Sequence, residues 1–214
     1  MATKLVIFDC DGVLVDTEPL TDVVLSKKLT EYGLPLAPSE IPGLFRGGTI
    51  QAVGEEAMRR GATLPDNWLD DLYAAVFDAL RHDVPVIDGV FDLIDVLDGA
   101  GIGRAIASNG PVAKMKISLT PSGLWDRFAG RIYTGHHHGP KPKPDMLLRI
   151  MADAGVTPDE TVMIDDMPAG FNAAKAAGIR CFGYVADGDP DRVNGTGAVP
   201  VTNFDQIALA LDLR

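Results

Sequence analysis

The chain has 214 residues, of which 46% are hydrophobic, so it can bury a full core as one domain or as one domain with an insertion. Its net charge of −11 at pH 7 argues against nucleic acids and anionic membrane surfaces as partners, since these favour clusters of Lys and Arg. No apolar stretch approaches the roughly 20 residues that cross a bilayer, and the first residues lead into a strand rather than a signal peptide. We therefore expect a cytoplasmic protein, with Cys10 and Cys181 as reduced thiols.

Four short runs rich in β-forming residues predict strands, and helical pattern or loop separates each from the next. The runs cover residues 5–8, 103–107, 161–164 and 180–185. This alternation predicts a parallel α/β sheet. Pro168 and Gly178 mark the two ends of one helix, because proline suits the first helical turn and glycine the position just past the last.

The pattern changes between residues 18 and 82, where three stretches have helical periodicity and no convincing strand occurs. The economical interpretation is an all-helical insertion between the first strand and the rest of the sheet. We expect the insertion to span residues 17–86, with residues 1–16 and 87–214 forming the α/β core. Trp68, Tyr73 and Phe77 lie at helical spacing and are predicted to form the core of the insertion.

Two carboxylates, Asp9 and Asp11, follow the first predicted strand. In open α/β sheets ligands bind beyond the carboxyl ends of the strands, which is where these residues lie. A cation would offset their repulsion, and oxygen ligands with room for water and a phosphate suit Mg²⁺. Gly12 allows a tight turn beside such a ligand. The alternative is a strand end with two solvated aspartates.

Three further segments place polar groups at the ends of strands or helices. Ser108 and Asn109 follow the second predicted strand, where they suit either a phosphate cradle or an ordinary helix cap. In "KPKPD" the prolines hold a lysine ahead of a helix, which fits either phosphate charge or a solvated basic turn. Asp165 and Asp166 repeat the pair of carboxylates at the end of another strand.

The order acid pair, hydroxyl, lysine and acid pair resembles the haloacid dehalogenase superfamily of phosphotransferases. The resemblance rests on "DCDGVLVDTEP", "SNG", "KPKPD" and "DDMPAG", and it covers essentially the whole chain. It points to the branch with a helical cap after the first motif, which includes β-phosphoglucomutase and many sugar-phosphate phosphatases. It implies a Rossmann-like doubly wound parallel sheet with an inserted all-helical cap domain. "SNGPVAKM" is further similar to phosphatases that act on 6-phosphogluconate and related sugar phosphates.

The resemblance also implies catalytic roles. Asp9 would attack phosphorus and form an aspartyl-phosphate. Asp11 would protonate the leaving oxygen and later deprotonate the attacking water, while its main-chain carbonyl contacts Mg²⁺. Ser108 and Lys141 would hold the oxygens of the transferred phosphoryl group. The pattern K-P-x-P-D selects Lys141, and a shift of register would select Lys143 instead.

The remaining site residues follow in the same way. Asp165 and Asp166 would complete a metal site with Asp9 and Asp11. Four residues are candidates for binding the substrate, with a plain surface role as the alternative for the arginine. These four are Asn109, Gly110, Arg46 and Gly47.

Two groups of conspicuous residues have simpler interpretations. His136, His137 and His138 favour a solvated loop beside the site over a metal cluster, because adjacent loop histidines do not converge on one ion without a tight turn. Cys10 lies between two catalytic candidates, but strand alternation turns its thiol away from theirs, so we expect it in the core.

The function predicted from the sequence is a Mg²⁺-dependent phosphomonoester hydrolase for a small phosphorylated metabolite, as a monomer or weak homodimer. The helical cap would close, exclude water and select the substrate. Alternatives are a β-phosphoglucomutase-type mutase and a non-catalytic metabolite-binding protein. The mutase is disfavoured because its histidine aligns with Thr21 and its phosphate-binding arginine with Ile50.

Overall fold

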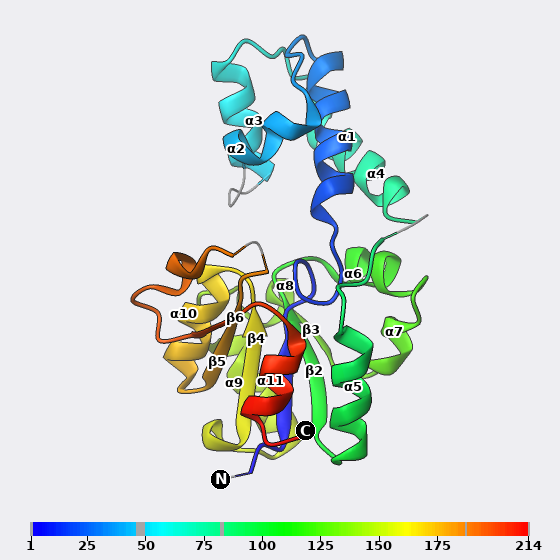
Figure 1. Ribbon diagram of the computed structural model, residues 1–214. Helices are drawn as coiled ribbons and strands as arrows, with labels where there is room; N and C mark the ends of the chain where they lie inside the picture. The colour runs from blue at the N-terminus through cyan, green and yellow to red at the C-terminus, as the bar shows by residue number, and fades with distance from the viewer. Residues whose placement is uncertain (1, 46–49, 82–83, 187, 214) are drawn as a thin grey trace. The chain divides into compact units, whose positions relative to one another are not determined.

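The computed structural model describes residues 2–45, 50–81, 84–186 and 188–213 (Figure 1). The chain divides into two units, one made of Met1–Asp16 with Pro85–Arg214 and the other of Thr17–Val84. The second boundary lies slightly before the predicted residue 86. Among the described residues, no helix is both long and apolar enough to span a bilayer.

The first unit contains a six-stranded sheet in which every pair of neighbouring strands is parallel, in the order β3-β2-β1-β4-β5-β6. The strands are β1 Leu5–Phe8, β2 Gly103–Ser108, β3 Ile132–Thr134, β4 Thr161–Asp165, β5 Arg180–Tyr184 and β6 Val199–Val201. The chain starts in the middle of the sheet and winds outward in both directions. This is the predicted doubly wound, Rossmann-like architecture.

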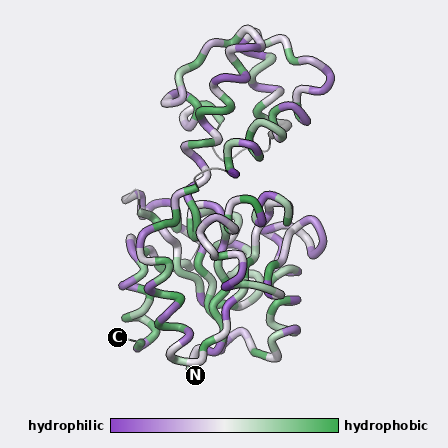
Figure 2. The backbone as a smooth tube through the Cα atoms, turned by 90° about the vertical axis from the view of Figure 1, so that its right-hand side faces the viewer, coloured by the Kyte–Doolittle hydropathy of each residue, from purple (hydrophilic) through white to green (hydrophobic). Residues whose placement is uncertain are grey.

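Helices cover both faces of the sheet (Figure 1). The helices of this unit are α5 Val90–Gly99, α6 Val112–Leu119, α7 Leu124–Arg127, α8 Gly135–His138, α9 Asp145–Ala154, α10 Pro168–Ala177 and α11 Phe204–Ala210. Helices α9 and α10 pack on the face that carries Leu5 and Ile7. Phe8 points to the other face, where its ring meets Phe128 edge-on at 5.6 Å between centroids. Figure 2 shows the hydrophobic segments gathered inside this unit.

The two outermost strands were not predicted from the sequence. Strands β3 and β6 have three residues each, and β6 includes Pro200. A run of three residues is too short to establish a period of two, and proline argues against a strand except at an edge. In contrast, α10 begins at Pro168 and ends before Gly178, as predicted, and Gly178 takes the left-handed conformation that favours glycine.

The regular elements described in the second unit are all helical. It contains α1 Glu18–Glu31, a 3-10 turn Pro38–Glu40, α2 Ile41–Phe45, α3 Ile50–Arg59 and α4 Trp68–Ala79. Helix α1 packs against α4, and the buried residues of α4 are Leu72 and Val76, followed by Leu80 just past its end.

The predicted core of the helical unit was therefore wrong in detail. Tyr73 is exposed, and Trp68 and Phe77 are only partly buried. The aliphatic residues at positions 72, 76 and 80 share one face with a spacing of four, and this face is the buried one. The indole of Trp68 instead lies over Gly54, at a place where any Cβ on residue 54 would clash.

Candidate active site

The candidate site lies at the carboxyl ends of three adjacent strands, β2, β1 and β4. Strand β1 pairs with β2 on one side and with β4 on the other, so Asp9, Ser108 and Asp165 come from adjacent strand ends. The backbone N–H of Asp9 donates to the carbonyl of Ile164 at 2.9 Å, which continues the ladder one step beyond the strand. Parallel pairing thus collects residues that are more than 50 positions apart in the sequence.

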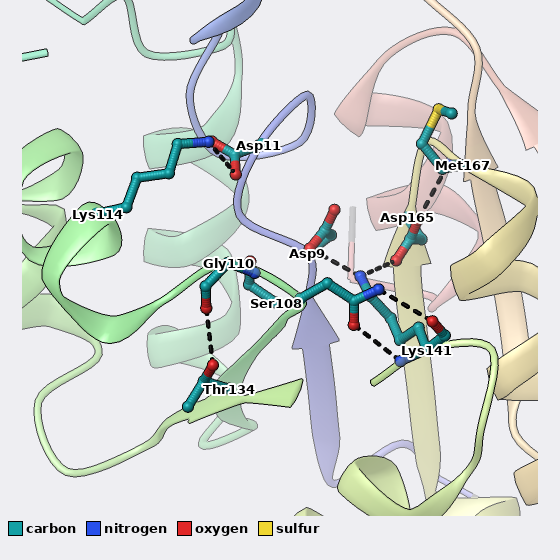
Figure 3. Close-up of polar contacts among 10 residues, drawn as sticks. Asp9, Asp11, Ser108, Gly110, Lys114, Thr134, Lys141, Asp165 and Met167 are labelled. Atoms are coloured by element: carbon teal, nitrogen blue, oxygen red, sulfur yellow. Dashed lines mark hydrogen bonds and ion pairs between the residues drawn. The ribbon is translucent and has the colours of Figure 1, made fainter. Parts of the chain in front are cut away.

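Lys141 connects two of the buried carboxylates (Figure 3). Its Nζ lies 2.8 Å from Asp9 Oδ1 and 2.7 Å from Asp165 Oδ2. Burial by itself would lower the pKa of Lys141, but attraction by Asp165 and Asp9 outweighs burial and raises it. Lys141 is therefore held as an ammonium inside the site, whereas Lys143 is exposed.

Asn109 supports the main chain of Lys141. Its side-chain Nδ2 donates to the Lys141 carbonyl at 3.0 Å, and its Oδ1 accepts from the Lys141 N–H at 2.8 Å. Both ends of the amide are thus engaged with the main chain of Lys141, a partner 32 residues away that nothing local in the sequence reveals. The predicted contact of Asn109 with the substrate stays a prediction.

Ser108 and Gly110 form a small turn after β2. The Gly110 N–H donates to Ser108 Oγ at 3.0 Å, and Thr134 Oγ1 donates to the Gly110 carbonyl at 2.7 Å. Ser108 is buried. These two hydrogen bonds hold the chain in a turn just ahead of α6.

Asp11 is paired with a lysine that sequence reasoning did not single out. Lys114 Nζ donates to Asp11 Oδ2 at 2.8 Å (Figure 3). Lys114 is the third residue of α6, within the quoted segment "SNGPVAKM". A lysine in the first turn of a helix that follows a strand-end serine is the signal that would have found it.

Three carboxylates converge as a possible cation site. Asp9, Asp165 and Asp166 each offer an oxygen within 4.8 Å of the others. Asp11, predicted in the same set through its main-chain carbonyl, contributes no carboxylate oxygen to this group. Asp165 is already engaged, since Oδ1 accepts from the Met167 N–H at 3.0 Å and Oδ2 contacts Lys141. Both oxygens of Asp165 thus have a partner within the protein, and Asp9 shares Lys141 with it through Oδ1.

The residues present fit a divalent cation. Asp166 Oδ1 is buried and has no hydrogen-bond partner among the described residues. Burial, followed by the charges of Asp9 and Asp165, raises the pKa of Asp166 to about 8. Burial likewise raises the pKa of Asp9 to about 7, with Asp165 adding to the shift and Lys141 opposing it. A hard cation with oxygen ligands would offset this unfavourable concentration of negative charge.

Two glycines allow the carboxylates to sit where they do. Gly12 has a φ of +78°, and a Cβ there would collide with the carboxylate of Asp166. Gly170, in the first turn of α10, has the carboxylate of Asp165 where its Cβ would stand. The backbone of the loop after β1 and of α10 therefore approaches the acidic groups more closely than any other residue type allows.

Other predicted residues lie elsewhere or outside the described part. Arg46 and Gly47 fall outside the described residues, as does the side chain of Ile50. The three histidines form the short helix α8 rather than a loop, and none joins a possible metal group in the part of the chain that is described. Cys10 is fully buried, as expected of a core residue.

The comparisons define the class of protein. A model of the haloacid dehalogenase-like hydrolases matches residues 6–184. The chain therefore belongs to the haloacid dehalogenase-like hydrolase family, as the sequence motifs indicated.

Several curated relatives are similar along most of their length. The chain is 31% identical over 186 residues to phosphoglycolate phosphatase of Pseudomonas putida, covering 84% of this chain and 68% of that protein. It is 31% identical over 221 residues to hexitol phosphatase A of Escherichia coli, covering 98% and 95%. It is 26% identical over 187 residues to 6-phosphogluconate phosphatase of Escherichia coli, covering 86% and 83%.

Solved structures agree on the fold. A conserved haloacid dehalogenase-like protein of unknown function from Agrobacterium tumefaciens has a TM-score of 0.84 at 32% identity, covering 99% of this chain and 98% of that one. A hydrolase of the family from Deinococcus radiodurans, solved with bound phosphate and sodium, has a TM-score of 0.82 at 28% identity and covers 99% and 96%.

Proposed function

We propose that the protein is a Mg²⁺-dependent phosphomonoester hydrolase that acts through an aspartyl-phosphate on Asp9. The observation that carries the proposal is the buried group formed by Lys141 with Asp9, Asp165 and Asp166, in which one carboxylate oxygen has no partner among the described residues. Such a group combines a nucleophile, a fixed ammonium and ligands for a cation at one strand end.

The proposed reaction has two steps. In the first, an oxygen of Asp9 attacks phosphorus while the bond from phosphorus to the leaving oxygen breaks, and Asp11 gives that oxygen a proton. In the second, the Asp11 carboxylate takes a proton from a water molecule, whose oxygen attacks phosphorus and releases inorganic phosphate from Asp9. Ser108 and Lys141 hold the phosphoryl oxygens in both steps.

Asp9, Asp166 and the main-chain carbonyl of Asp11 are the proposed ligands of Mg²⁺, with Asp165 supporting them directly or through water. When bound, the cation supplies positive charge against the phosphoryl oxygens. Lys141 supplies the second positive charge from the protein itself and orients Asp9 through their 2.8 Å contact. The second contact of Lys141, to Asp165, fixes the ammonium between the two carboxylates.

The proposed substrate is a small phosphorylated metabolite, with a sugar, polyol or sugar-acid phosphate preferred. Support comes from the relatives named for hexitol, 6-phosphogluconate and phosphoglycolate phosphatase activity. We further propose that the helical unit Thr17–Val84 acts as a cap that selects among such substrates. The two residues that flank this unit in the sequence are hydrogen-bonded to each other, since the Asp16 N–H donates to the Pro85 carbonyl at 2.9 Å.

A panel of sugar, polyol and sugar-acid phosphates, together with phosphoglycolate, tests the proposal. Purified protein should release inorganic phosphate from at least one of them with MgCl₂ and from none with excess EDTA. The Asp9→Asn variant is the control for contaminating phosphatases. Absence of phosphate release from the whole panel with either Mg²⁺ or Mn²⁺ would contradict the proposal.

The same assay separates the hydrolase from the mutase and from a binding protein. A hydrolase releases phosphate in stoichiometric amounts and needs no sugar bisphosphate. A mutase converts β-glucose 1-phosphate to glucose 6-phosphate faster than it releases phosphate, and a bisphosphate stimulates it. In the structure, Thr21 donates its hydroxyl at 2.9 Å to the carbonyl of Thr17, the N-cap residue of α1, and it offers no imidazole.

A further inference from the structure

The ion pair between Asp11 and Lys114 joins two segments that are 103 residues apart. The Lys114 side chain is 21% exposed and that of Asp11 is 28% exposed, so water screens the pair only in part. Figure 3 shows the pair set apart from the group formed by Asp9, Lys141 and Asp165. The two lysines thus pair with different carboxylates: Lys141 contacts Asp9 and Asp165, whereas Lys114 contacts Asp11.

Gly110 shows how close the pair of Asp11 and Lys114 lies to the turn formed by Ser108 and Gly110. A Cβ on Gly110 would lie 3.8 Å from Asp11 Oδ2, 3.8 Å from Lys114 Cδ and 3.3 Å from Ser108 Oγ. The Asp11 carboxylate is therefore held on the side of the site that carries the Ser108 hydroxyl. It is not one of the three converging carboxylates.

We propose that Lys114 is a positioning residue that aims the Asp11 carboxyl group at the leaving oxygen of the substrate. The inference rests on the proposed function, in which Asp11 gives its proton to that oxygen as the bond to phosphorus breaks. The step converts Asp11 to a carboxylate, and the ammonium 2.8 Å away stabilises this product form. Lys114 extends from α6, which is anchored in the sheet unit by the buried Met115 and Leu119, so the ammonium that holds Asp11 belongs to that unit.

The dependence of the rate on the leaving group tests this role. The Lys114→Met variant keeps a flexible apolar stem of similar length but removes the charge. The assay measures kcat/KM, which reports the steps up to departure of the leaving group, for p-nitrophenyl phosphate and for the best sugar or polyol phosphate. Nitrophenolate departs without a proton, whereas a sugar alkoxide needs one.

For Lys114→Met we expect kcat/KM to fall about tenfold or more with the sugar phosphate and less than about threefold with p-nitrophenyl phosphate. The loss with the sugar phosphate is a part of the roughly 10²–10⁴-fold that a general acid contributes to the rate. The ratio of the two values is independent of the fraction of folded protein, so partial misfolding leaves it unchanged. Lys114→Arg, which retains a cation, should restore most of the ratio. Lys116→Met is the matched control, because Lys116 lies on the same helix over the ring of Trp125.

A double variant completes the test. In the Asp11→Asn background, Lys114→Met should lower kcat/KM for the sugar phosphate little further, because both changes impair the same proton transfer. Equal losses with both substrates, or additive losses in the double variant, would overturn the positioning role and assign Lys114 to the substrate or to packing. If wild-type protein releases no phosphate from any substrate, the proposed function itself fails, which is a distinct result.

Discussion

Asp9 is the buried carboxylate on which the proposed chemistry depends, and its replacement by Asn keeps the shape while removing the nucleophile. We expect Asp9→Asn to reduce phosphate release by at least about 10²–10⁴-fold. The fold should be retained, because the substitution removes one of three crowded carboxylates. Phosphate release and circular dichroism are the measurements, and exposed Asp159→Asn is the control. Near-normal turnover by Asp9→Asn, freed of wild-type protein, would exclude the covalent mechanism.

The two lysines of "KPKPD" are expected to differ sharply. Lys141→Ala should nearly abolish kcat/KM, because it removes the ammonium between Asp9 and Asp165. Breaking a buried ion pair also costs about 3–5 kcal/mol, so we expect a lower melting temperature. Lys143→Ala should change neither quantity appreciably, since this side chain is exposed. Steady-state kinetics and thermal unfolding of both variants provide the comparison, and the reverse ranking would show that the register is wrong.

Helix α10 shows how an element serves the site through its backbone. Alanine at Gly170 would gain about 1 kcal/mol in helix propensity, but its Cβ would collide with the fully buried carboxylate of Asp165. Overpacking typically costs about 1–3 kcal/mol, so the collision outweighs the propensity. We therefore expect Gly170→Ala to lower both the melting temperature and kcat, because Asp165 holds Lys141.

Gly99, at the end of α5, is the matched control for that prediction. No atom lies within 4 Å of the place where its Cβ would stand. Gly99→Ala should therefore leave kcat unchanged and be neutral or stabilising by about 0.5–1 kcal/mol. A Gly170→Ala protein as stable and active as Gly99→Ala would contradict the close approach of α10 to Asp165.

For the molecule as a whole, the crowded carboxylates make the stability of the folded state depend on pH and on metal binding. The pKa of Asp9 rises from 3.8 to about 7 and that of Asp166 from 3.8 to about 8 on folding without metal. Between about pH 4 and pH 8 the folded state therefore binds more protons than the unfolded state, so the free energy of unfolding falls as pH rises through this window. We expect the melting temperature of metal-free protein to decrease over the same range.

Binding of Mg²⁺ should oppose this fall of the melting temperature with rising pH. Its ligands must be deprotonated, so binding competes with protons and strengthens as pH rises. Thermal unfolding with EDTA and with MgCl₂ should show a larger stabilisation by Mg²⁺ at pH 8 than at pH 5. The Asp166→Asn variant, which lacks one proposed ligand charge, should show a smaller difference. An equal effect of Mg²⁺ at both pH values, in wild type and variant alike, would argue against these ligands.

Much of the fold was predictable from local patterns in the sequence. The four longest strands are mostly apolar, and nearly all of their residues are buried. Such runs are typical of parallel strands covered on both faces, and they end where polar residues begin. The same property placed Asp9, Ser108 and Asp165 at strand ends. Strands β3 and β6 escaped prediction because three residues carry no periodicity. The prediction that the aromatic residues of α4 form the core of the helical unit was wrong because the aliphatic face of this helix is the buried one.

Only the tertiary structure decides which partner each polar side chain of the site has. No sequence pattern shows that Asn109 holds the backbone of Lys141, or that Lys114 pairs with Asp11. Nor does the repeated carboxylate pair at the end of β4 reveal that Asp165 contacts Lys141 while an oxygen of Asp166 lacks a partner among the described residues. Sequence patterns record burial and chain direction, which are local, whereas a hydrogen bond or ion pair depends on distances of about 3 Å between segments that only packing brings together.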